Sequence, residues 1–138
     1  MRAALERWLG KLQDRQGDRE LAAAKRKQGN AALAAGNLQE AAAHYRAAID
    51  AAPRDPDSHV NLGYVLLEQG DAAAAEAPLR DAVALGGGAD AHYLLGQVQA
   101  ALGRWSEAGQ SYREAVAARP DFGFAWSALG AALEQLGD

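Results

Sequence analysis

The sequence contains no cysteine, only 4 prolines, few aromatic side chains and no long apolar run. The absence of cysteine excludes disulfide bonds, thiol nucleophiles and cysteine-bound metal clusters. No apolar run approaches the roughly 20 residues of a transmembrane helix, and charged residues interrupt the N-terminus too often for a secretory signal. No segment alternates β-branched and aromatic residues as a strand would, whereas alanine, the best helix former, is abundant. The composition therefore predicts an all-helical protein, with the cytoplasm as the default location.

Residue patterns typical of catalysis or cofactor binding are also missing. The chain has three histidines, and none has the further ligands nearby that a metal site needs. The glycines at 86–88 are not followed by the Lys-Ser/Thr pair of a phosphate-binding loop. No serine has the flanking residues of a nucleophile. The sequence predicts a protein that is not an enzyme and that holds no cofactor or metal.

A glycine recurs at a regular interval. Gly29, Gly63, Gly96 and Gly130 are separated by 34, 33 and 34 residues. The same residue types follow two of them at identical offsets: Gly36, Ala41, Tyr45, Ala48 and Pro53 in one unit, and Gly103, Ala108, Tyr112, Ala115 and Pro120 in the other. Self-similarity at this period predicts stacked helix-turn-helix units. We expect the two helices of a unit to approach closely at the glycine, with Tyr45, Leu79 and Tyr112 filling the gap between units.

This pattern resembles the tetratricopeptide repeat (TPR) family, which has Leu-Gly, small residues, an aromatic, an alanine and a proline at these places. The departures are Lys25, Gln28 and Gly87, together with histidine at positions 59 and 92, which we interpret as packing residues of the repeat. The resemblance implies an all-α, right-handed α-α superhelix, a TPR solenoid. We expect three full repeats (22–55, 56–88 and 89–122) and a fourth first helix (123–138), preceded by an N-terminal amphipathic helix and linker (1–21).

The N-terminal stretch carries an apolar stripe at helical spacing, made of Leu5, Trp8, Leu9 and Leu12. An isolated helix of this length is marginal in water, so we expect the stripe to pack on something. Three interpretations remain open: a cap on the first repeat, docking on another chain or a further part of the protein, and a helix lying on a membrane surface. We expect a break at Gly17-Asp18, with Asp18 capping the next helix.

Other helix ends are marked by local signals. Asp55 before Pro56 predicts a capped helix start, and Ser106 is the expected cap of the helix that follows Gly103. Pro78 falls inside a helix. Three glycines at 86–88 predict a helix end and a connector.

The TPR resemblance also implies a binding surface. In this family the first helices line a concave groove, which here points to Arg26, Lys27, Asn30, Asn61, Tyr64, Glu68, Tyr93 and Gln97. Amide side chains can both donate to and accept from a peptide backbone, and tyrosine adds flat apolar area. We expect this groove to bind an extended peptide or a segment of a partner protein. The alternative interpretation is a solvated helix face.

One group of TPR domains clamps a C-terminal carboxylate with asparagines and cations. Arg26, Asn30 and Asn61 match three of those positions, but Asp90 and Leu94 stand where two cations belong. An anion there repels a carboxylate. The resemblance therefore does not extend to carboxylate binding.

Charge is distributed unevenly along the chain. Residues 1–55 hold ten basic and seven acidic side chains, whereas residues 56–138 hold four and eleven. This arrangement argues against a nucleic-acid track and permits head-to-tail contacts. The repeat pattern stops in mid-unit, so we expect a fragment of a larger protein, or homo-oligomers through Leu5, Trp8, Leu9, Leu12, Trp126 and Leu133. An alternative function is the recognition arm of a larger enzyme, such as a transferase, whose catalytic domain lies beyond residue 138.

Overall fold

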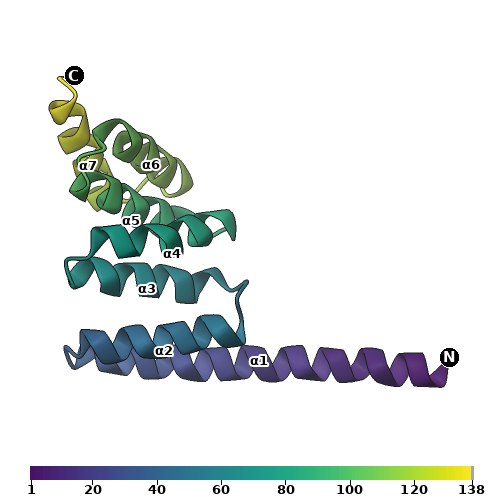
Figure 1. The fold of residues 1–138 in the computed structure, drawn as a ribbon. Coiled ribbons are helices and arrows are strands. Elements are labelled where there is room, and N and C mark those ends of the chain that lie inside the picture. The colour runs from purple at the N-terminus through teal and green to yellow at the C-terminus, as the bar shows by residue number, and fades with distance from the viewer. Residues whose placement is uncertain (138) are drawn as a thin grey trace. The chain divides into compact units, whose positions relative to one another are not determined.

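The computed structural model of the protein describes residues 1–137. Within them the chain forms helices and no strand, so the all-α prediction is confirmed. Figure 1 shows the helices α1 (Arg2–Ala34), α2 (Leu38–Ala51), α3 (Pro56–Glu68), α4 (Ala72–Ala84), α5 (Gly88–Ala101), α6 (Trp105–Ala118) and α7 (Gly123–Gln135). They fall into two compact units, Met1–Arg54 and Asp55–Asp138, which are described separately below.

The first unit is a pair of helices of unequal length. The C-terminal part of α1 packs against α2, and the turn between them uses Gly36 at φ +80°, a backbone conformation that glycine adopts without strain. The rest of α1 continues well past the end of α2 (Figure 1).

The predicted break at Gly17-Asp18 is wrong, because α1 runs through it without interruption. A glycine in a helix costs only about 1 kcal/mol relative to alanine, and the surrounding residues are good helix formers. Gln16 also donates a hydrogen bond across this point to Glu20, at 3.4 Å. Asp18 therefore lies in mid-helix and caps nothing.

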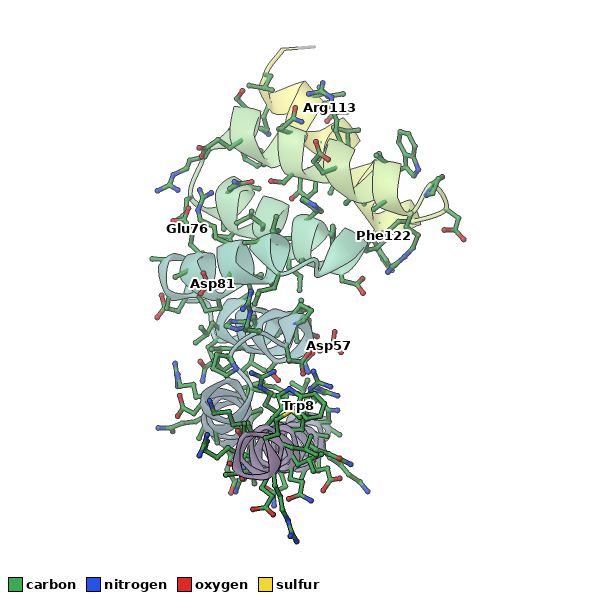
Figure 2. The ribbon with its side chains drawn as sticks, turned by 90° about the vertical axis from the view of Figure 1, so that its right-hand side faces the viewer. Trp8, Asp57, Glu76, Asp81, Arg113 and Phe122 are labelled. Atoms are coloured by element: carbon green, nitrogen blue, oxygen red, sulfur yellow. The ribbon has the colours of Figure 1, made fainter. Side chains whose placement is uncertain are left out.

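The interpretation of the N-terminal stretch as a cap on the first repeat is also wrong. Leu5, Trp8 and Leu9 are 54%, 56% and 45% exposed, and Leu12 is 39% exposed. Their apolar stripe is therefore left largely exposed and does not cap the first repeat. Figure 2 shows Trp8 on this part of α1.

The second unit contains α3 to α7, in which each helix packs against the next and α3 also contacts α5. The backbone N–H of Asp57 donates to the Asp55 side chain at 3.1 Å, which confirms Asp55 as the cap of α3. Pro78 lies inside α4, as predicted. The Ser106 prediction is wrong: α6 begins at Trp105, with Arg104 in the capping position.

The core of each repeat is a contact between a helical glycine and one large side chain. A Cβ atom placed on Gly29 would lie 2.5 Å from the Tyr45 ring, and one on Gly96 would lie 2.5 Å from Tyr112. Gly63 has the same relation to Leu79, at 2.3 Å. No side chain fits at these distances, so glycine is what allows the two helices of each pair to approach. The predicted close approach is confirmed.

Candidate binding faces on the first helices

Asn30 of α1 is held by a tyrosine of the neighbouring helix. The hydroxyl of Tyr45 in α2 donates a hydrogen bond to Asn30 Oδ1 at 2.6 Å. Burial raises the pKa of Tyr45, so its hydroxyl keeps its proton at neutral pH. The bond orients the amide of Asn30, which is an exposed residue, so that the Nδ2 hydrogens are left for another acceptor. Arg26 and Lys27, the other predicted site residues of the first unit, lie one turn earlier on α1.

Gln97 of α5 occupies the same repeat position as Asn30 and is held in the same way. The hydroxyl of Tyr112 in α6 donates to Gln97 Oε1, and Gln97 Nε2 donates to the hydroxyl of Tyr93 at 3.3 Å. Burial raises the pKa of Tyr112, and Tyr93 adds to the effect. The bonds set the orientation of the Gln97 amide, while one Nε2 hydrogen and one Oε1 lone pair are left over.

Tyr93 belongs to a second group of contacts near the start of α7. Its ring lies 4.9 Å from Phe122 and 6.0 Å from Tyr112, between centroids. The Arg119 guanidinium stands 4.7 Å above the Phe122 ring and donates to both carboxylate oxygens of Asp90, at 3.1 and 3.2 Å. These bonds to Asp90 raise the pKa of Arg119. Figure 2 shows Phe122 at the turn where α6 ends and α7 begins.

Three predicted site residues, Asn61, Tyr64 and Glu68, lie on α3, which contacts α5 within the second unit. Asn61 is half-buried, whereas Tyr64 and Glu68 are exposed. Because α3 and α5 are equivalent helices of successive repeats, equal repeat positions face the same side. Tyr64 and Gln97 hold the same position. Asn61 and Glu68 lie three and four residues from Tyr64, and Tyr93 lies four residues from Gln97, so each is on the same side of its helix. We call these five residues the α3-α5 face.

Next to this face, an open depression forms at the start of α7. It is lined by Arg119, Asp121, Phe122, Gly123, Phe124 and Ser127. Phe124 is 75% exposed, which is unusual for so large an apolar side chain. Arg119 and Phe122 were not expected from the sequence, because no local motif marks a residue that bonds to a helix 29 positions earlier in the chain.

The predicted site residues thus divide between the two units: Arg26, Lys27 and Asn30 in the first, and the other five in the second. The α3-α5 face is brought together within one unit. That the residues of both units line one groove together stays a prediction.

The residues predicted to mediate self-association lie at both ends of the chain. Besides the stripe on α1, Trp126 of α7 is 51% exposed, with its indole N–H donating to the Pro120 carbonyl at 2.8 Å. Leu133 is half-buried against the core cluster of Ala108, Tyr112, Leu129 and Ala132. Their role in association stays a prediction.

Neither a metal site nor a membrane span is found in residues 1–137. This part of the chain has no cluster of three or more histidine, aspartate or glutamate side chains suited to a metal ion. It also has no helix that combines the length and apolar character needed to cross a bilayer.

Comparison with known proteins agrees with the repeat geometry. Residues 26–90 and residues 89–122 each match a model of the tetratricopeptide repeat. The chain belongs to the tetratricopeptide repeat family. No curated protein matches it.

Several solved TPR structures are similar to this chain. The first TPR of Spaghetti (RPAP3), bound to the HSP90 peptide SRMEEVD, has a TM-score of 0.84 at 25% identity, covering 87% of this chain and 96% of that one. The first TPR domain of human RPAP3 has a TM-score of 0.81 at 25% identity, covering 85% and 93%. The TPR domain of Arabidopsis OM64 has a TM-score of 0.82 at 22% identity, covering 85% and 98%.

Proposed function

We propose that this TPR protein is an interaction module that holds an extended segment of a partner protein on its α3-α5 face. The observation that carries the proposal is the fixed amide of Gln97, oriented by Tyr112 and Tyr93. An amide held in place loses less conformational freedom on binding than a mobile one. It can also satisfy the alternating donors and acceptors of a peptide backbone. The peptide-bound state of the similar RPAP3 domain supports this use of the fold.

The charges around the α3-α5 face indicate which segments it prefers. Asp57 and Glu68 are exposed on α3. On α5, Asp90 forms an ion pair with Arg119, and Leu94 is apolar. An acidic peptide such as the SRMEEVD bound by the similar domain would meet like charges here. We propose that the preferred partner segment carries lysine or arginine, together with apolar side chains that lie against Tyr64.

A peptide array tests this proposal. Ten-residue peptides that differ only in Lys, Gln or Glu at fixed places are immobilised and probed with the labelled full chain. We expect the signal to fall in the order Lys, Gln, Glu. Fluorescence anisotropy on the best peptide then measures Kd for Tyr64→Ala and Asn61→Ala, each of which should weaken binding by roughly tenfold if it is an anchor of the interface.

The matched control is Arg113→Ala. Arg113 is an exposed residue of the second helix α6 and is not part of the α3-α5 face; Figure 2 labels it. It should leave Kd unchanged. Equal Kd values for all three variants and the wild type would remove the α3-α5 face from the binding site, and a preference for the Glu peptides would contradict the proposed charge selectivity.

A further inference from the structure

Among the described residues, no helix covers α7 in the way that a second helix covers the first helix of each earlier repeat. Trp126, Gly130 and Leu133 stand at the fourth, eighth and eleventh positions of the fourth repeat; we call them the α7 seat. In each of the three earlier repeats the glycine and the residue three places after it are buried. In α7, by contrast, Gly130 is exposed and Leu133 only half-buried.

The space above Gly130 is open. A Cβ atom on Gly130 would meet no other atom within 4 Å, whereas the same atom on Gly29, Gly63 or Gly96 would collide with the second helix of its repeat. The α7 seat is therefore shaped to receive a helix with a large side chain opposite Gly130.

The three second helices show what such a helix looks like. In α2, α4 and α6, the eighth residue is the large side chain that faces the glycine: Tyr45, Leu79 and Tyr112. An alanine stands four places before it in each helix (Ala41, Ala75 and Ala108), and all three alanines are fully buried. A β-branched residue stands four places after it: Ile49, Val83 and Val116.

The first fourteen residues of the chain carry a similar spacing of an alanine, a large side chain and an apolar residue. Trp8 is the seventh residue of α1, with Ala4 four places before it and Leu12 four places after it. This stretch is helical, and its Leu5, Trp8, Leu9 and Leu12 are exposed. The chain thus presents an uncovered seat for a second helix on α7, and an uncovered helix with the pattern of a second helix at the start of α1.

Two positions depart from the pattern: Leu12 is apolar but not β-branched, and Lys11 replaces an alanine. Lys11 stands where the second helices have a buried alanine, such as Ala115 of α6. Ala115 packs against Ala125 of α7, the first helix of the following repeat. A helix docked on the α7 seat has no following repeat in the described chain, so Lys11 would face water, as the outer face of a capping helix does.

Charge also favours contact between these two ends. Residues 1–16 hold four basic and two acidic side chains. Helix α7 itself carries one acidic side chain, Glu134, and no basic one. The unlike net charges of the two ends attract each other at short range.

We propose that the N-terminal stretch of α1 in one copy of the chain docks on the α7 seat of a second copy, with Trp8 opposite Gly130. The contact joins two different surfaces and is therefore head-to-tail, so it adds further copies until a ring closes. It uses neither Tyr64 nor Gln97, and is independent of the proposed peptide binding.

Sedimentation velocity on the full chain, from about 1 µM to 1 mM, tests the proposal. We expect the mean mass of the wild type to rise with concentration beyond that of a dimer. Two variants should each remove this rise. Trp8→Glu places a charge in the contact, and Gly130→Gln fills the space above the glycine. Since overpacking a close contact typically costs 1–3 kcal/mol, Gly130→Gln should raise the association Kd by about tenfold or more.

The folded state of each copy should tolerate both changes, because Trp8 is exposed and a Cβ atom on Gly130 meets nothing. Circular dichroism and urea unfolding check this point. Gly17→Gln is the matched control: Gly17 also has nothing within 4 Å of an added Cβ, lies in the same helix as Trp8, and falls outside the docked fourteen residues. It should associate like the wild type.

An equimolar mixture of Trp8→Glu and Gly130→Gln distinguishes the possible arrangements. Each variant keeps one intact end, so the mixture should form a one-to-one dimer and nothing larger. Loss of association in Trp8→Glu with none in Gly130→Gln would mean that α1 pairs with α1, and the reverse would mean that α7 pairs with α7. Either result overturns the proposal, as does a wild type that stays monomeric throughout the range.

Discussion

The helices α5 and α7 hold the same glycine at the same repeat position, and only one of them is covered. Gly96 of α5 is buried under the Tyr112 ring, whereas Gly130 of α7 faces open space. The backbone at both positions is helical, so glycine is not needed for its conformation. The difference shows that the recurring spacing of the repeat specifies a contact surface for another helix, and that α7 has this surface although no helix of the described residues covers it.

The largest expected effect on stability comes from removing the Tyr112 side chain, which covers Gly96. Tyr112 is 1% exposed and contacts both α5 and the α6-α7 core. Tyr112→Ala should lower the free energy of unfolding by about 3–5 kcal/mol, as for other buried aromatic residues. Urea unfolding followed by circular dichroism measures it. A loss below about 1 kcal/mol would mean that the covered and uncovered glycines differ little in energy.

A smaller effect, of opposite sign at the two sites, is expected from adding one methyl group. Gly96→Ala should destabilise the fold by about 1–3 kcal/mol, because the new Cβ would lie 2.5 Å from Tyr112. Gly130→Ala should stabilise it by up to about 1 kcal/mol, because alanine is the better helix former and nothing is displaced. The measurement is the same urea titration, done below the concentration at which the chain associates. Equal signs at the two sites would contradict the comparison.

A buried hydrogen bond also joins α5 to α6, and α7 has no counterpart of it among the described residues. Ser111 Oγ of α6 donates to Gln99 Oε1 of α5 at 2.6 Å, and the residue of α7 that corresponds to Gln99 is Leu133. Ser111→Ala should lower stability by about 1–2 kcal/mol, since it leaves the buried amide oxygen without its donor.

The double variant Ser111→Ala, Gln99→Leu should recover most of that loss, because both polar groups are then gone. A double variant that is less stable than Ser111→Ala alone would show that the amide of Gln99 matters for another reason.

The smallest effect is expected at the surface beside the turn from α5 to α6. Glu76 of α4 accepts from Arg80 at 2.9 Å and from Arg104 at 2.7 Å, and its pKa is lowered, chiefly by the bond to Arg80. Figure 2 labels Glu76. Because its folded pKa lies below the unfolded value of about 4.3, this stabilisation is present above that pH and is lost as the pH falls through the folded pKa.

Glu76→Gln should therefore cost at most about 1 kcal/mol at pH 7, and the difference from the wild type should vanish in acid. Unfolding titrations at pH 7, 5 and 3 test the trend. A difference that is the same at all three pH values would mean that the charge of Glu76 contributes nothing.

The sequence predicted the repeat contacts well because they depend on spacing. The glycine, the alanines and the large eighth residue of the second helix recur in register, and each proved to lie where that register requires. Helix ends were predicted less well. Asn37 and Asp71 hold the capping positions of α2 and α4, so the register pointed to Arg104 for α6, whereas local cap preference pointed to Ser106.

The hydrogen bonds that orient the candidate binding residues could not be predicted from the sequence. Asn30 and Gln97 were selected as peptide-binding residues, but nothing local shows that tyrosines 15 positions later would orient their amides. The break expected at Gly17 failed for another reason: a propensity cost of about 1 kcal/mol is too small to end a helix among good helix formers.

The open seat on α7 has a consequence for how such a chain can change over evolutionary time. Because α7 already offers the surface that α6 meets in α5, a duplicated copy of residues 103–136 inserted after Leu136 would place a copy of α6 on α7 and a copy of α7 after it. Lengthening this protein would need no new core, only an in-frame duplication.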